Sequence, residues 1–179
     1  MKIQKILNNN VVVTSDEWGR ECIVMGKGLA FGRKVGDQID SVRIEKTFTL
    51  SGSDLLSRIE PLYASLPLVH ILLAQQIIAY AKDQLQNHLS ESIYLTLTDH
   101  ISSAITRFRE GIFLPNPLKA DIKNFYPAEY EVGLLANRLI LEQTGTAFTE
   151  DEAAYIALHF VNAALGQGPD AAYQALGKG

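Results

Sequence analysis

Residues 2–15, KIQKILNNNVVVTS, contain two short β-rich runs on either side of three asparagines. Asparagine clusters separate strands, so Asn8–Asn10 predicts a turn. Four runs of this kind are expected to form strands: Lys2–Leu7, Val11–Ser15, Glu21–Met25 and Val42–Leu50. Residues 1–55 therefore predict a small antiparallel sheet. A unit of this size, without a metal or a disulfide, is marginally stable alone, which favours association with a second copy.

After Ser51-Gly52-Ser53-Asp54 the hydrophobic pattern becomes helical. Pro115-Asn116-Pro117 interrupts this pattern, and Thr149-Glu150-Asp151-Glu152 has the form of a capping box at the start of the last helix. The expected helices cover residues 65–89, 93–111, 118–124, 127–143 and 149–165. The sequence thus predicts an α+β multidomain protein, in which an antiparallel sheet is followed by an all-α bundle of about five helices.

The composition of the 179-residue chain excludes several classes of protein. With 47% hydrophobic and 20% charged residues and a net charge of −4, it is neither disordered nor collagen-like. Residues 1–55 carry a net charge of +1, from eight Lys/Arg and seven Asp/Glu, whereas the remaining residues carry −5. The charge therefore changes where the periodicity changes, which points weakly to a polyanion-binding segment joined to a different unit.

Two features favour a cytoplasmic protein. The single cysteine, Cys22, has no intramolecular disulfide partner, which suits a reducing compartment. The N-terminus lacks the apolar run of a signal peptide, and the most apolar stretch, Leu68–Ala81, is interrupted by His70, Gln75 and Gln76. We therefore expect no membrane insertion.

The common motifs of nucleotide binding, catalysis and metal binding fail. Gly26-Lys27-Gly28 lacks the spacing of a phosphate-binding loop, and Phe31 stands where a dinucleotide fingerprint needs its third glycine. No nucleophile elbow occurs, and no two histidines lie three or four positions apart. We expect no enzyme, no cofactor and no metal site; a hydrolase that uses Asp99 and His100 is kept as a weaker alternative.

The β-rich segment combines residue types that suit a structured RNA. Asparagine amides can hydrogen-bond base edges, Lys27 can contact phosphate, Phe31 can stack on an unpaired base, and glycines allow close approach of the backbone. The alternative is structural: Asn8–Asn10 is then a hairpin turn and Phe31 a core aromatic.

Three longer motifs in residues 1–55 are typical of a known RNA-binding domain. Lys5–Val11, Val24–Phe31 and Ile44–Lys46 strongly resemble the co-antiterminator RNA-binding domain of the BglG/SacY/LicT family of transcriptional antiterminators. The resemblance implies a four-stranded sheet that dimerises on a hairpin of nascent mRNA and prevents formation of the overlapping terminator. The RNA-contacting positions implied here are Lys5, Asn8, Asn10, Gly26, Lys27, Gly28 and Phe31. Many family members have arginine at position 27, and lysine lacks its planar bidentate fork.

The helical region resembles the first PTS regulation domain of the same family. The resemblance is carried by Leu95–His100, Leu114–Leu118 and Glu152–Phe160. It implies phosphorylation of His100 and His159 by the sugar phosphotransferase system, with the phosphocarrier and sugar-permease (EIIB-type) components as partners. Four parts are then expected: the RNA-binding domain over 1–55, a linker and the start of the first helix over 56–66, the regulation domain over 67–168, and a tail over 169–179. Family members usually carry a second regulation domain, so the chain is either a fragment or a member controlled through one domain.

Elementary chemistry agrees with the resemblance. His100 and His159 each lie at the border of an apolar helical face, and a neutral imidazole can accept a phosphoryl group. The added negative charge can shift a dimer equilibrium. Asp99 points about 100° away from His100 around a helix, so we assign it a supporting role, to His159. The expected function is RNA-binding antitermination; the alternative is an oligomerisation scaffold without RNA binding.

Overall fold

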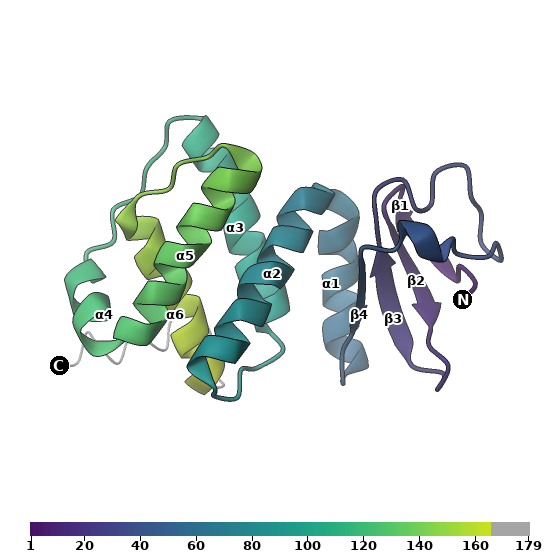
Figure 1. The fold of residues 1–179 in the computed structure, drawn as a ribbon, viewed down its shortest axis with the longest axis horizontal. Coiled ribbons are helices and arrows are strands. Elements are labelled where there is room, and N and C mark those ends of the chain that lie inside the picture. Colours follow the sequence, from purple (N-terminus) through teal and green to yellow (C-terminus); the bar gives the residue numbers. More distant parts are fainter. Residues whose placement is uncertain (166–179) are drawn as a thin grey trace. The chain divides into compact units, whose positions relative to one another are not determined.

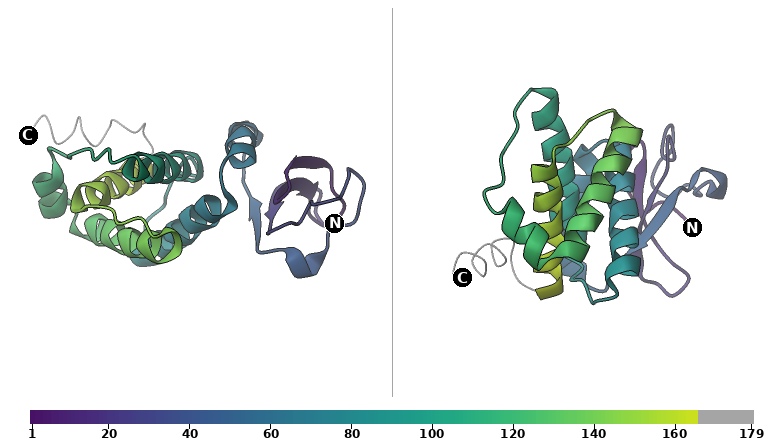
Figure 2. Two further views of the ribbon diagram at one scale, coloured as in Figure 1. Left: turned by 90° about the horizontal axis from the view of Figure 1, so that it is seen from above. Right: turned by 60° about the vertical axis from the view of Figure 1, so that its left-hand side comes forward.

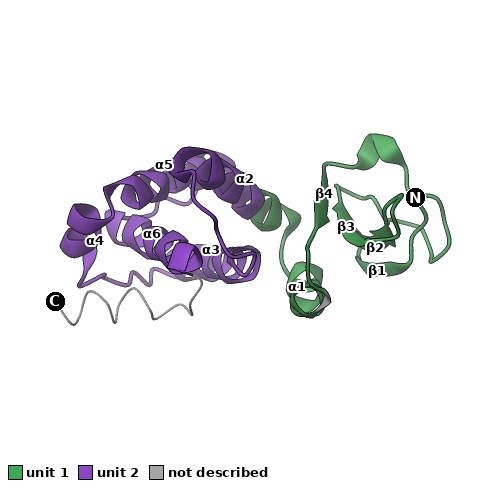
Figure 3. Ribbon diagram, turned by 90° about the horizontal axis from the view of Figure 1, so that it is seen from below, with its two compact units in different colours: residues 1–72 green, residues 73–179 purple. Residues whose placement is uncertain are grey.

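The computed structural model describes residues 1–165, without the side chain of Ser53. The chain divides into two compact units (Figure 3). We call residues 1–72 the sheet unit and residues 73–165 the helical unit; the division falls within helix α2 (Leu68–Leu85). The tail expected over 169–179 lies outside the described residues.

The sheet unit contains the predicted four-stranded antiparallel sheet, in the order β1-β2-β3-β4 (Figure 1). Its strands are β1 (Lys5–Asn8), β2 (Val11–Ser15), β3 (Glu21–Met25) and β4 (Lys46–Thr49). The two central strands have the predicted bounds. The outer strands are shorter than predicted, because residues 2–4 precede the paired segment of β1 and Ser41–Arg43 form a 3₁₀ helix ahead of β4.

Both faces of the sheet are covered. On one face Val12, Cys22 and Val24 pack with Leu29 and Ile39 from the segment between β3 and β4. Cys22 is fully buried, and this burial raises the pKa of its thiol, as befits an inert strand residue. Strand alternation directs their neighbours to the opposite face, where Val13, Ile23 and Phe48 are paired across the strands.

Helix α1 (Ser53–Ser65) packs on this second face. Its residues Leu56, Ile59 and Tyr63 are buried, and the Tyr63 ring lies 6.0 Å from the ring of Phe48. We expected residues 56–66 to hold a linker and only the start of a helix. The sequence concealed α1 because Pro61 lies inside it, where proline removes a backbone hydrogen bond and argues against a helix. The described chain therefore has six helices instead of about five.

The helical unit contains the remaining helices. They are the C-terminal part of α2, α3 (Ile93–Arg109), α4 (Lys119–Phe125), α5 (Pro127–Thr144) and α6 (Glu150–Leu165). Their starts and ends agree with the predicted helices within a few residues, except that α2 is shorter than residues 65–89. The apolar core includes Leu97, Ile101, Ala136, Ile156 and Phe160.

Helices α5 and α6 lie side by side (Figure 2). The two helices approach closely at Gly133, where a Cβ atom would overlap the backbone of Ala153. This packing fixes α6, which carries His159 and Glu152. Within residues 1–165, none of the helices combines the length and apolarity needed to cross a membrane.

Candidate functional site

The two predicted phosphorylation sites come together in the helical unit. His100 lies on α3 and His159 on α6, and their ring centroids are 4.8 Å apart with an interplanar angle of 47°. Sequence spacing alone could not show this, because the two histidines are far apart in the chain. We call them the histidine pair.

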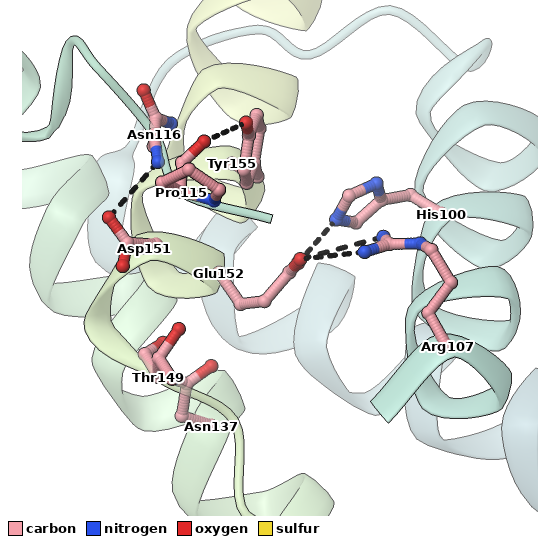
Figure 4. Close-up of polar contacts among 9 residues, drawn as sticks. All are labelled: His100, Arg107, Pro115, Asn116, Asn137, Thr149, Asp151, Glu152 and Tyr155. Carbon is pink, nitrogen blue, oxygen red and sulfur yellow. Dashed lines mark hydrogen bonds and ion pairs between the residues drawn. The ribbon is translucent and has the colours of Figure 1, made fainter. Parts of the chain in front are cut away.

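A buried acidic residue contacts one member of the histidine pair, His100. Glu152 of α6 is fully buried, and its Oε2 lies 2.9 Å from Nε2 of His100 (Figure 4). Its other oxygen, Oε1, is 3.4 Å and 3.5 Å from the two terminal nitrogens of Arg107 on α3. A carboxylate without solvent needs such partners, since an unpaired buried charge is strongly destabilising.

His159 is held in its neutral form. Burial, followed by the neighbouring His100, lowers the pKa of His159 from 6.5 to about 3. An imidazole with this pKa is unprotonated throughout the range of cytosolic pH. It therefore retains the lone pair that a phosphoryl acceptor requires.

The loop between α3 and α4 is hydrogen-bonded to α6 near the histidine pair. The Tyr155 hydroxyl donates a 2.7 Å hydrogen bond to the carbonyl oxygen of Pro115, and the backbone N–H of Asn116 donates a 3.0 Å bond to Asp151 (Figure 4). The Tyr155 ring lies 6.0 Å from the ring of His100. The segment Leu114–Leu118, quoted above as a motif, is thus placed near the histidines by contacts with α6.

Sequence reasoning missed Glu152 and Arg107. We interpreted Glu152 as a capping-box residue, but its carboxylate turns toward His100 instead of capping α6. Arg107 lies seven positions after His100, a spacing of two helical turns that places it on the same face of α3. Asp99, to which we assigned a supporting role, is exposed. Of the other histidines, His70 is buried in the sheet unit and His88 is exposed.

The sheet unit brings three of the predicted RNA-contacting residues, Asn10, Gly26 and Gly28, together at the end of the sheet where β2 begins and β3 ends. The side chain of Asn10, at the turn between β1 and β2, accepts a 2.9 Å hydrogen bond from the N–H of Gly28. The N–H of Gly26 donates to the carbonyl oxygen of Asn10. A Cβ atom at Gly26 would overlap the carbonyl oxygen of Arg43, so the close approach requires glycine. Lys27 and Phe31 follow in the same segment after β3; Lys27 is exposed, and Phe31 has 72% of its surface exposed.

The other two predicted contacts, Lys5 and Asn8, are bonded to α1. Lys5 Nζ forms a 2.9 Å ion pair with Glu60, and Asn8 Nδ2 donates to the carbonyl oxygens of Tyr63 and Ala64 at 3.2 Å and 3.0 Å. The Asn8 oxygen accepts a bond from the N–H of Asn10. The exposed position of Phe31 removes the alternative that it is a core aromatic.

Two family models match the chain. The model of the CAT RNA-binding domain matches residues 1–55, and that of the PRD domain matches residues 75–163. The fold and these matches place the chain among transcription antiterminators. It belongs to the family that joins a CAT RNA-binding domain to a PRD regulation domain.

Individual relatives agree. The transcription antiterminator LicT of Bacillus subtilis is 44% identical over 167 residues, which are 93% of this chain and 60% of LicT. The beta-glucoside operon antiterminator of Dickeya chrysanthemi is 44% identical over 165 residues, 92% of this chain and 58% of that protein. The chain thus spans about three fifths of the length of these relatives.

A solved structure has the same fold over most of the chain. The crystal structure of GlcT CAT-PRDI has a TM-score of 0.75 and 30% identity, and covers 91% of this chain and 97% of its own. A structure of LicT in complex with its RNA target is 56% identical, covers 30% of this chain and 98% of its own, and has a TM-score of 0.28.

Proposed function

We propose that the protein is a cytoplasmic antiterminator whose sheet unit, as a dimer, binds a hairpin of nascent mRNA and blocks the overlapping terminator. The helical unit acts as its sensor and accepts phosphoryl groups on His100 and His159 from the sugar phosphotransferase system. The observation that carries the proposal is the match to an RNA-binding domain and a regulation domain in one chain, combined with a histidine pair 4.8 Å apart.

The end of the sheet that contains Asn10, Gly26 and Gly28 supports the RNA-binding half of the proposal. The segment that follows β3 there carries an exposed aromatic ring for stacking, Phe31, and an exposed cation, Lys27. An aromatic stack with a base contributes about 1–3 kcal/mol, and a lysine neutralises phosphate. These two contributions suit an unpaired or bulged region of RNA.

The contacts of α1 add a condition to RNA binding. The amide nitrogen of Asn8 meets RNA only if it leaves the two carbonyl oxygens in the last turn of α1. Lys5, whose side chain is 61% exposed, is paired with Glu60 of the same helix. The same helix covers the apolar sheet face that contains Phe48. We infer that α1 shifts from this position when RNA binds, which gives the sensor a route to the sheet unit through the chain.

Phosphorylation supplies the switch. A phosphoryl group adds strongly negative charge beside the buried carboxylate of Glu152. Repulsion and desolvation there favour a different packing of α3 and α6, or a different state of the dimer.

RNA binding by the whole chain tests the proposal. We expect saturable binding of a terminator-overlapping hairpin that weakens as salt is raised. Phe31→Ala should weaken it roughly tenfold or more, whereas Phe125→Ala, at an equally exposed phenylalanine on α4, should leave it unchanged. Asn10→Ala should also weaken binding, with the exposed neighbour Asn9→Ala as its control. If the parent binds no such hairpin, and these variants behave like it, the oligomerisation scaffold becomes the better account.

A further inference from the structure

We propose that Glu152 fixes the tautomer of His100, so that Nδ1 of His100 is the atom that receives the phosphoryl group. The inference rests on the proposed sensor function and names the acceptor atom within it. Its basis is the contact of 2.9 Å between Nε2 of His100 and a carboxylate that has no exposed surface.

The direction of this hydrogen bond follows from its partners. A carboxylate oxygen only accepts hydrogen bonds, so His100 donates its Nε2 proton to Glu152. A neutral imidazole has one proton, and the bond to the carboxylate retains it at Nε2. The lone pair that attacks phosphorus is therefore on Nδ1. Figure 4 shows this second ring nitrogen turned away from Glu152 and Arg107.

Transfer to Nε2 is disfavoured by the same contacts. It would break the bond to Glu152 and bring the oxygens of a phosphoryl group against a buried negative charge. Arg107 would not neutralise a phosphoryl group at Nε2, because it already contacts the other oxygen of Glu152, Oε1. The ring cannot simply move away either, since His159 packs against it with 4.8 Å between the centroids.

The transfer forms one bond to phosphorus and breaks another. The Nδ1 lone pair of His100 forms the new N–P bond, and the bond between phosphorus and the donor's nitrogen breaks. The donor is a phosphohistidine of a carrier protein that is protonated at its other ring nitrogen, so the leaving nitrogen keeps that electron pair and the donor departs as a neutral imidazole. The phosphorylated His100 ring is then an imidazolium, whose positive charge is paired with the Glu152 carboxylate. His100 retains its Nε2 proton, which stays hydrogen-bonded to Glu152. Glu152 touches no reacting atom and is a positioning residue.

Nitrogen-15 NMR of the unphosphorylated whole chain tests the tautomer directly. The His100 signals, assigned by their loss in His100→Gln, should show a protonated Nε2 and an unprotonated Nδ1. Glu152→Gln should remove this preference because an amide can both donate and accept. Glu150→Gln, an exposed position on the same helix, should retain it. The opposite tautomer in the parent would overturn the inference.

Phosphorylation tests the acceptor atom. The His159→Gln chain, which leaves His100 as the one predicted acceptor, is labelled with phosphoenolpyruvate and the phosphotransferase carrier proteins. Detection specific for the phosphohistidine isomer should find the Nδ1 form at His100. The label should fall roughly tenfold in Glu152→Gln and persist in Glu150→Gln, with helix content checked by circular dichroism.

The outcomes separate the two proposals. The Nε2 isomer at His100 overturns this inference and leaves the sensor function standing. Absence of label from both histidines of the parent overturns the sensor function and this inference with it. If Glu152→Gln does not fold, the tautomer and the isomer found in the parent still decide.

Discussion

The low pKa of His159 predicts that mild acid destabilises the helical unit. The folded state holds this pKa near 3, whereas the unfolded chain has the ordinary value of 6.5. Between these values the unfolded state binds more protons, so stability is complete above pH 6.5 and is lost progressively as the pH falls toward 3. For this one group, lowering the pH from 7.5 to 5 should cost about 2 kcal/mol of the free energy of unfolding.

Urea unfolding followed by far-ultraviolet circular dichroism measures this loss. The one tryptophan, Trp18, lies in the sheet unit, so its fluorescence would report the wrong part of the chain. Titrating groups far from His159 contribute equally to the parent and to His159→Gln, so the difference between the two pH dependences reports His159 together with its coupling to His100. His88→Gln, at an exposed histidine, is the control and should behave like the parent. An equal loss of stability in the parent and in His159→Gln would refute the reasoning.

Three further predictions follow from single contacts. Gly133→Ala forces α5 away from the backbone of Ala153, so urea unfolding should show a loss of about 1–3 kcal/mol; unchanged stability would contradict the close packing. Glu60→Gln removes the ion pair that holds β1 to α1, so affinity for the hairpin should rise a few-fold; weaker binding would mean that α1 does not compete with RNA. Arg107→Met removes one partner of the buried Glu152 carboxylate, so urea unfolding should show a loss of about 2 kcal/mol in the free energy of unfolding. Arg109→Met, at an exposed position, should change this free energy little, and an equal loss in both variants would contradict the role of Arg107.

Much of the architecture followed from local sequence patterns. β-rich runs and turn residues predicted β2 and β3 with their observed bounds, because both strands lie between clear turns. Helical spacing predicted α3 and α5 in the same way. Helix α1 was missed since its formation depends on burial of Ile59 and Tyr63 against the sheet, a tertiary contact that outweighs the proline within it.

The site was predicted less completely than the fold. Motifs pointed to His100 and His159, but the acidic partner was sought next to His100 in sequence, at Asp99. The residue that contacts His100 is Glu152, whose position in the first turn of α6 suggested a cap. A capping signal and an inward-facing carboxylate look alike in sequence, and the packing of α6 against α3 decides between them.

Transcription in vitro across a leader that carries the hairpin and the terminator tests the central claim most directly. The account predicts that the chain raises read-through of the terminator and that Phe31→Ala abolishes most of this increase, while Phe125→Ala does not. Read-through that is the same with and without the protein, or that rises equally with Phe31→Ala, would contradict it.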